Sequence, residues 1–222
     1  MRASSRPDPS PLEAQAIRSA SAELGVSLTV DQAARLASFA ALLVKWNRVY
    51  NLTSLDKPEQ VLTHHLLDSL SIVPHLEQLA GGRSLRILDV GAGGGLPSIP
   101  VALALRAMRV TALDSVQKKV AFLQQVQLEL GLANLEAVHS RVEQYRADPF
   151  DVIVSRAFAT LTDIVHLTSH LLAQGGVWAA MKGSYPAEEI NALPSTVELL
   201  SAVKLRVPLL GAERHLIVLR PH

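Results

Sequence analysis

The chain has 222 residues, of which 49% are hydrophobic, and this is enough for one substantial α/β domain with an appendage. Its 21 basic and 20 acidic side chains give a formal net charge of +1, so the composition shows no basic face for nucleic acid, and an aromatic content of 4% argues against a base-stacking platform. The absence of cysteine excludes disulfides and thiolate chemistry and fits a reducing compartment.

The first part of the chain is predicted to be helical. Residues 10–13 (SPLE) have the form of a capping box with proline at the first helical position, and Gly25 ends the helix that they open. Residues 29–32 (TVDQ) form a second capping box at the start of a helix with an apolar stripe. A third helix is expected over residues 58–76.

Gly81-Gly82 is the predicted boundary between a helical N-terminal extension, residues 1–80, and a second domain, residues 81–222. In the second domain apolar strand patterns alternate with helical patterns, which predicts a parallel sheet with helices on both faces. The strands are expected near 86–90, 110–114, 135–139, 151–155 and 177–181, and the helices near 98–106, 116–130, 160–173 and 187–192. Two further strands, 197–207 and 215–219, are expected to end the sheet as an antiparallel pair.

The most informative stretch is LRILDVGAGGGLP, residues 85–97. A short apolar run leads to Asp89, then to four glycines within five positions, then to Pro97, which suits the first turn of a helix. This order predicts a buried strand, a tight turn and a helix start. Glycines allow the backbone to come close to a ligand, and a helix N-terminus offers free N–H groups to it.

Two classes of ligand use such a turn, dinucleotides and S-adenosylmethionine. The dinucleotide fingerprint requires a small residue at the position of Leu96, so it is broken here. The pattern Asp89-x-Gly91-x-Gly93-x-Gly95 instead resembles the first motif of class I methyltransferases, in which the turn approaches the amino-acid end of S-adenosylmethionine. A tight turn without a ligand remains the alternative.

A second acid supports a nucleotide-like ligand. Asp114 ends the apolar run of the second predicted strand and follows Gly95 by 19 residues. An acid at this place can accept hydrogen bonds from ribose hydroxyls, although a solvated turn acid would also fit.

Five ordered segments resemble the RsmG (GidB) family, which are class I methyltransferases acting on the RNA of the bacterial small ribosomal subunit. The segments are DVGAGGGLPSIP at 89–100, WNRVYNLTS at 46–54, HLLDSL at 65–70, SRVE at 140–143 and VSRAF at 154–158. The resemblance runs from about residue 12 to about residue 220, and one departure is Ser98, where the family usually has glycine. It implies an α/β class I fold, Rossmann-like, with a mostly parallel seven-stranded sheet, a terminal antiparallel hairpin and a helical N-terminal extension.

The resemblance also assigns cofactor contacts. Gly91 and Leu96 would line the methionine side of S-adenosylmethionine, Gly93 of the same turn would also contact the cofactor, and Asp114 would hold the ribose. The remaining contacts would be Val142 against the adenine ring, Glu143 near the adenine amine, and Arg156. Plain structural roles stay open: Val142 as a core residue, Glu143 as a solvated acid and Arg156 in a salt bridge.

The resemblance implies methyl transfer to N7 of a guanine near the decoding centre of 16S ribosomal RNA, as naked RNA or within the 30S subunit. Guanine N7 has a lone pair and no proton, so alignment suffices and no general base is expected. Candidate phosphate contacts are Arg48, Arg141, Arg156 and Lys182, although Lys182 would also fit a simple surface charge.

The remaining expectations concern partners and alternatives. The histidines show no metal-ligand spacing, no apolar run has the length of a membrane span, and a cytoplasmic monomer is expected. The alternatives are a class I methyltransferase for another RNA, a protein or a small molecule, or a non-catalytic module that binds S-adenosylmethionine.

Overall fold

The computed structural model describes residues 11–55 and 57–222, and within them seven strands form one sheet in the order β3-β2-β1-β4-β5-β7-β6. The strands are β1 (Arg86–Val90), β2 (Arg109–Asp114), β3 (Leu135–His139), β4 (Phe150–Arg156), β5 (Leu172–Lys182), β6 (Val197–Leu205) and β7 (Arg214–Pro221). The first five strands pair in parallel, whereas β7 is antiparallel to both β5 and β6. The predicted mostly parallel sheet with a terminal antiparallel hairpin is confirmed.

One strand begins earlier than predicted. β5 starts at Leu172 rather than near residue 177, and its pairing with β4 shifts register between the pairs Phe150–Leu172 and Val152–Val177. Gly175 has a φ of 75° and lies within this shift. Glycine inside a strand often marks such a bulge, so it interrupted the apolar pattern without ending the strand.

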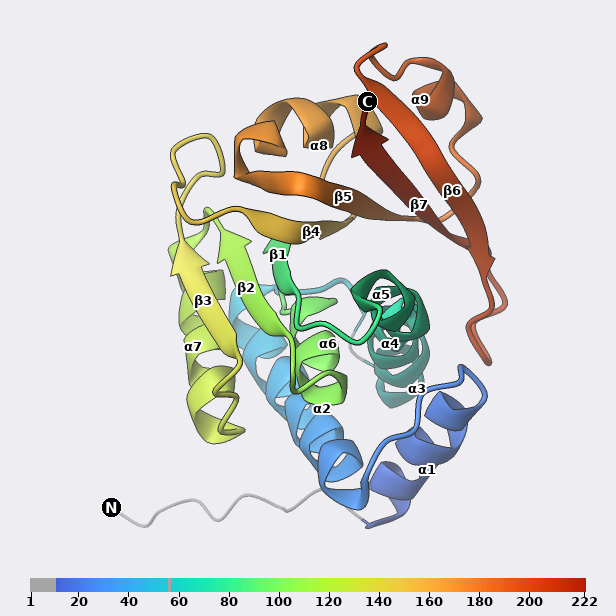
Figure 1. Ribbon diagram of the computed structural model, residues 1–222. Helices are drawn as coiled ribbons and strands as arrows, with labels where there is room; N and C mark the ends of the chain where they lie inside the picture. The colour runs from blue at the N-terminus through green and yellow to red at the C-terminus, as the bar shows by residue number, and fades with distance from the viewer. Residues whose placement is uncertain (1–10, 56) are drawn as a thin grey trace.

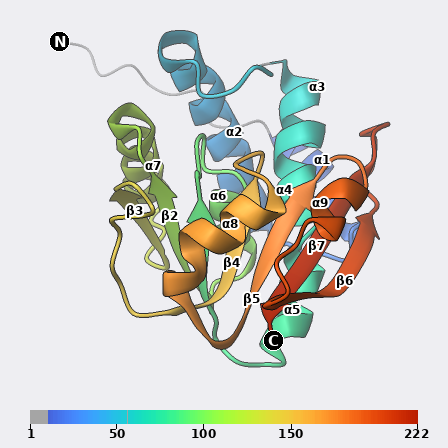
Figure 2. The same cartoon turned by 90° about the horizontal axis from the view of Figure 1, so that it is seen from above.

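Helices cover both faces of the sheet (Figures 1 and 2). α8 and α9 lie on one face, and the helices of the first 80 residues lie on the other with α6 and α7. The bounds are α6 (Ser98–Ala104), α7 (Gln117–Glu129), α8 (Leu161–Thr168), a 3₁₀ turn η2 (Ser169–Leu171) and α9 (Ala187–Asn191). Each predicted helix of the second domain is therefore present, with the last turn of the 160–173 prediction tightened to 3₁₀ and then passing into β5.

The N-terminal helices begin with α1 (Pro11–Ala22) and α2 (Val30–Tyr50). The second predicted capping box is confirmed, because the Gln32 N–H donates to the Thr29 hydroxyl and the Thr29 N–H donates to the Gln32 side chain. The first predicted capping box includes Ser10, which lies outside the described residues.

The prediction of one continuous third helix is wrong. The segment divides into α3 (Pro58–Gln60), a π-helix η1 (Val61–Leu67), α4 (Asp68–Leu70) and α5 (Val73–Ala80). Pro74 stands in the first turn of α5, where it lacks an N–H and its ring obstructs a helix continuing from before it. The Ser71 hydroxyl donates to the Asp68 carbonyl at 2.6 Å, and this bond closes the preceding turn.

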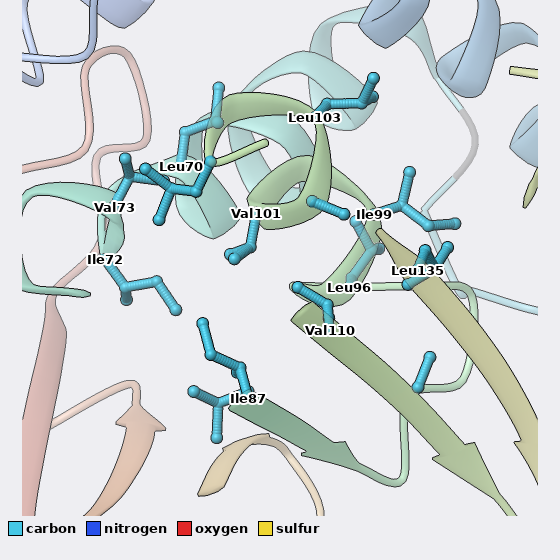
Figure 3. Close-up of a cluster of buried hydrophobic side chains, with 14 of the residues drawn as sticks. Leu70, Ile72, Val73, Ile87, Leu96, Ile99, Val101, Leu103, Val110 and Leu135 are labelled. Atoms are coloured by element: carbon cyan, nitrogen blue, oxygen red, sulfur yellow. The ribbon is translucent and has the colours of Figure 1, made fainter. Parts of the chain in front are cut away.

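One apolar core joins the N-terminal helices to the sheet. Figure 3 shows Ile72 and Val73 near Ile87 of β1, with Val101 of α6 and Val110 of β2 in the same cluster. The opposite face of β1 contributes Leu88 and Val90 to a second core under α8, as the two-residue period of a strand requires. The division of the chain at residue 80 stays a prediction. No helix of residues 11–55 and 57–222 is long and apolar enough to cross a membrane.

Because this core is shared, a defect in α2 should destabilise the sheet as well. Phe39 is fully buried in α2 and lies 6.4 Å from the Phe122 ring of α7. We predict that Phe39→Ala lowers the free energy of unfolding by about 3–5 kcal/mol in a single denaturant transition. Val49→Ala, at a side chain 71% exposed on the same helix, should change it by less than about 0.5 kcal/mol. Two transitions, with only the less stable one shifted by Phe39→Ala, would contradict this.

Candidate functional site

The glycine turn after β1 has the geometry that the sequence predicted. The N–H groups of Gly91 and Ala92 both donate to the Leu113 carbonyl, at 2.9 and 3.0 Å, so the turn folds toward the end of β2. Gly91 has a φ of 72°, and a Cβ there would lie 2.5 Å from a ring carbon of Phe158. Only glycine allows this backbone to pass under the Phe158 ring. α6 starts at Ser98, as predicted, and Pro97 is its N-cap residue rather than a residue of its first turn.

Asp89 holds the start of α6. Its side chain is fully buried, and its Oδ2 accepts a hydrogen bond from the Ser98 N–H at 3.0 Å, while Oδ1 has no hydrogen-bond partner within the described ranges. Burial raises the pKa of Asp89 to about 6, against the opposing effects of hydrogen bonding from Ser98 and the positive charge of Arg156. Asp89 is therefore a buried anchor of the turn rather than a ligand contact.

Asp114, the predicted ribose contact, fixes the other side of the turn. Its Oδ2 accepts the Gly93 N–H at 2.9 Å, and its Oδ1 accepts the Val116 N–H at 2.8 Å. Lys119 Nζ lies 3.8 Å from Oδ2. A carboxylate has about four acceptor positions, so these contacts orient Asp114 and leave acceptor capacity for ribose hydroxyls.

A cavity of about 350 Å³ lies between the ends of β1, β2 and β3 and is called the adenosine cavity below. Gly91, Asp114, Val142 and Glu143 line it, so four of the seven predicted cofactor contacts come together there. Val142 is buried and also belongs to the core under α8, which shows that the core and cofactor roles considered for it are compatible. Glu143 and Arg141 are exposed at the same cavity.

A second cavity of about 570 Å³ adjoins the first and is called the target cavity below. Gly93, Leu96 and Arg156, the other predicted contacts, line it together with the loop 52–55 and the end of η1. Gly91 and Ala157 line both cavities, so the two meet at the glycine turn. Such a pair of cavities at the carboxyl ends of parallel strands suits a nucleotide-like cofactor beside its substrate.

Arg156 has an acidic partner that the sequence does not reveal. Its Nη1 donates to Asp68 Oδ2 at 3.1 Å and to the His64 carbonyl at 2.9 Å. The other oxygen of Asp68 accepts from Arg214 Nε at 3.0 Å. Asp68 lay inside a segment that carried the resemblance, but neither it nor Arg214 was assigned a role, because no local pattern pairs residues so far apart in the chain.

The other candidate phosphate contacts separate into different places. Lys182 lines the target cavity, but its Nζ donates to Glu189 at 2.8 and 3.1 Å and to the Ala159 carbonyl at 2.9 Å. Arg48 does not join the site: it lines another, mainly apolar cavity between α1, α2 and η1. Its position on α2 places it beside residues of α1 and η1, which the sequence alone could not show.

His65 of η1 lies in the wall of the target cavity. Its Nε2 lies 2.7 Å from the Thr53 hydroxyl and 3.3 Å from the Leu55 carbonyl. Burial, followed by the charge of Arg156, lowers the pKa of His65, so the neutral ring is favoured. Asn47 Oδ1 accepts the Thr53 N–H at 2.8 Å, and these bonds together hold the loop 52–55 against the site. Among residues 11–55 and 57–222, no group of three or more His, Cys, Asp or Glu side chains could hold a metal ion.

Comparisons with known proteins decide the family. The family model described as "rRNA small subunit methyltransferase G" (GidB) matches residues 32–217. The chain belongs to this family. The protein named ribosomal RNA small subunit methyltransferase G from Aromatoleum aromaticum is 53% identical over 203 residues, which cover 89% of this chain and 94% of that protein. Its namesake from Pseudomonas aeruginosa PAO1 is 51% identical over 199 residues, covering 89% and 91%.

Solved structures agree on the fold. An S-adenosylmethionine-dependent methyltransferase from Aquifex aeolicus has a TM-score of 0.54 at 16% identity, covering 76% of this chain and 96% of that chain. Coclaurine N-methyltransferase, solved with N-methylheliamine and SAH, has a TM-score of 0.55 at 14% identity, covering 86% and 74%. The likeness establishes the class I methyltransferase fold, as the family resemblance implied.

The close passage of Phe158 over Gly91 gives a test of the turn. We predict that Gly91→Ala weakens S-adenosylmethionine binding at least tenfold in calorimetry, because the new Cβ displaces the ring that adjoins the adenosine cavity. It should also cost about 1–3 kcal/mol of stability. Gly131→Ala is a matched control, since Gly131 has a φ of 58° but nothing within 4 Å of a new Cβ. Equal affinity of the two variants would show that the contact does not shape the cavity.

The pKa of Asp89 predicts a pH dependence of stability. Folding raises it from 3.8 to about 6, so the folded state keeps a proton that the unfolded state releases in this window. The contribution of Asp89 to the free energy of unfolding therefore falls as the pH rises through this range, by roughly 3 kcal/mol in total. Above this range the contribution is constant. Asp89→Asn cannot titrate. Its stability relative to the unsubstituted protein should rise by up to that amount from about pH 4 to about pH 7 in urea titrations. A difference that does not change with pH would refute the assignment.

Proposed function

We propose that this protein transfers a methyl group from S-adenosylmethionine to N7 of a guanine in the decoding-centre loop of 16S ribosomal RNA. The observation that carries the proposal is a match to the rRNA small subunit methyltransferase G family over residues 32–217, combined with two cavities that meet at the glycine turn. The adenosine cavity has the lining expected for the nucleoside of the cofactor, and the target cavity lies next to it.

The residues present fit S-adenosylmethionine. Asp114 offers oriented acceptor oxygens for the ribose, and Val142 offers an apolar surface for the adenine. Glu143 is exposed at the same cavity and would accept from the adenine amine. Gly91, Gly93 and Leu96 lie where the methionine part would pass toward the target cavity, and Arg156 would hold its carboxylate.

The bound cofactor supplies an electrophilic methyl group on a sulfonium. The chain supplies position: the turn is fixed by Asp89 from one side and by Asp114 from the other, and both bonds go to backbone N–H groups. Correct alignment of two reactants can contribute about 7–11 kcal/mol to a rate enhancement. Guanine N7 carries a lone pair and no proton, so the proposed mechanism contains no general base. His65, which burial keeps neutral, adds no positive charge beside the methylated guanine cation.

We further propose that the protein acts as a cytoplasmic monomer, on naked RNA or on the assembled 30S subunit. The division into an N-terminal extension, residues 1–80, and a methyltransferase domain, residues 81–222, belongs to the same proposal. Light scattering of the purified protein tests whether it is a monomer, and methylation of both RNA forms tests which of them is the substrate.

Methyl transfer to 30S subunits from cells that lack this protein tests the function. We expect tritium from labelled S-adenosylmethionine to enter the 16S RNA, and mass mapping to place it on one N7-methylguanine. Asp114→Asn should lose at least tenfold in cofactor affinity, because an amide cannot accept from Gly93, Val116 and ribose at once. Asp148→Asn, at a side chain 86% exposed, is the control. Label that enters another position, or enters free nucleosides equally well, would overturn the substrate assignment.

A further inference from the structure

A buried carboxylate joins two arginines in the wall of the target cavity. Asp68 is 2% exposed, and each of its oxygens accepts from one arginine, Oδ2 from Arg156 and Oδ1 from Arg214. Both guanidinium side chains remain 21% exposed and line the cavity. Two guanidinium groups share one carboxylate, so this cluster carries a net charge of +1.

The two arginines lie at different distances from the glycine turn. Arg156 ends β4, whose Ser155 pairs with Val90 of β1 immediately before the turn. Arg214 begins β7, three strands away from β1 in the order β1-β4-β5-β7. At about 4.8 Å between neighbouring strands, the backbone of Arg214 lies roughly 14 Å from that of β1 across the sheet, and its side chain extends from there to Asp68. The adenosine cavity extends the other way from the turn, over β2 and β3.

Arg214 also has N–H donors that make no hydrogen bond among the described residues. The structure gives it two hydrogen bonds among the described residues, from Nε to Asp68 and from Nη1 to the Glu213 carbonyl at 2.8 Å. A guanidinium has five N–H donors in a planar fork that matches the oxygens of a phosphate. Arg214 is therefore a preorganised anion-binding group: its buried partner Asp68 fixes its position, and it lines the cavity with unused donors.

We propose that Arg214, oriented by Asp68, binds a backbone phosphate of the RNA beside the target guanosine. The inference rests on the proposed function and extends it to a substrate contact. We assign the cofactor carboxylate to Arg156, which ends the strand next to β1, and the RNA phosphate to Arg214, which begins a strand farther from the turn. A phosphate suits Arg214 better than the guanine base, because the N7 edge that arginine would read has to face the methyl donor.

Asp68 has two effects in this arrangement. It offsets the repulsion between two guanidinium groups in one wall, and it fixes the direction of each group through a separate oxygen. It is therefore a positioning residue that links cofactor and RNA contacts, while touching neither in the proposed complex.

The experiment compares Arg214→Ala and Arg214→Lys with Arg220→Ala, using 30S subunits that lack the modification. Arg220 is the matched control, since it lies on the same strand, is 52% exposed and pairs with Glu198 away from the cavity. The measurements are KM and kcat for the subunits, direct filter binding of the subunits, calorimetric S-adenosylmethionine affinity, and salt dependence between about 50 and 200 mM at fixed Mg²⁺.

We expect Arg214→Ala to raise KM and the subunit dissociation constant about tenfold, with cofactor affinity and kcat within threefold. The slope of log affinity against log salt should become less negative by about 0.7–0.9, the loss of one phosphate contact. Arg214→Lys should keep the slope and raise KM by less, because it keeps the charge and loses the fork. This variant also keeps the test valid if the alanine variant does not fold.

Two results would overturn the inference. In the first, both Arg214 variants have the same salt slope and the same KM as Arg220→Ala. In the second, the Arg214 variants lose as much cofactor affinity as they gain in KM. The binding measurement separates this outcome from failure of the proposed function. An unsubstituted protein that transfers no methyl group would refute the function, whereas the filter-binding comparison would still decide the role of Arg214.

Discussion

The hydrogen bonds from Gly93 and Val116 to the Asp114 carboxylate are the constraint on which the site depends. They tie the turn after β1 to the end of β2, and the bonds from Gly91 and Ala92 to the Leu113 carbonyl strengthen the same connection. Asp89 fixes the opposite side through the Ser98 N–H. The turn is thus ordered before any ligand binds, so the affinity is not lowered by the entropic cost of ordering the turn. The two cavities take their shared boundary, at Gly91, from this rigid piece of backbone.

Much of the fold and of the cofactor site was predictable because its signals are local. A glycine turn, an apolar strand and a capping box each occupy a few neighbouring residues, so the sequence shows them directly. Strand alternation then places Gly91, Asp114 and Val142 at one edge of the sheet, since parallel strands end on the same side. The structure brings these residues to one cavity. Their contacts with the cofactor itself stay a prediction.

The remaining features depend on packing that no local pattern contains. Asp68 lies 88 residues from Arg156 and 146 residues from Arg214 along the chain, and only the folded sheet brings the three together. The third helix was predicted as continuous because its apolar residues repeat regularly, but Pro74 interrupts it and η1 adopts the wider π geometry. In β5 the prediction missed the first five residues of the strand, because the glycine bulge interrupts the apolar pattern while pairing with β4 continues.

The π-helix η1, which the sequence did not predict, contributes to the target cavity. A π-turn shifts every following residue around the helix axis, and such turns occur frequently at functional sites. η1 carries the His64 carbonyl and His65 and leads directly into Asp68, the first residue of α4, so η1 and α4 together contribute three groups to the wall of the target cavity. The helical first part of the chain, which the sequence presents as an appendage, therefore forms one side of that cavity, and its apolar residues share the core of the sheet. The glycine turn alone would hold a cofactor; together with η1 it encloses a place for the group that receives the methyl.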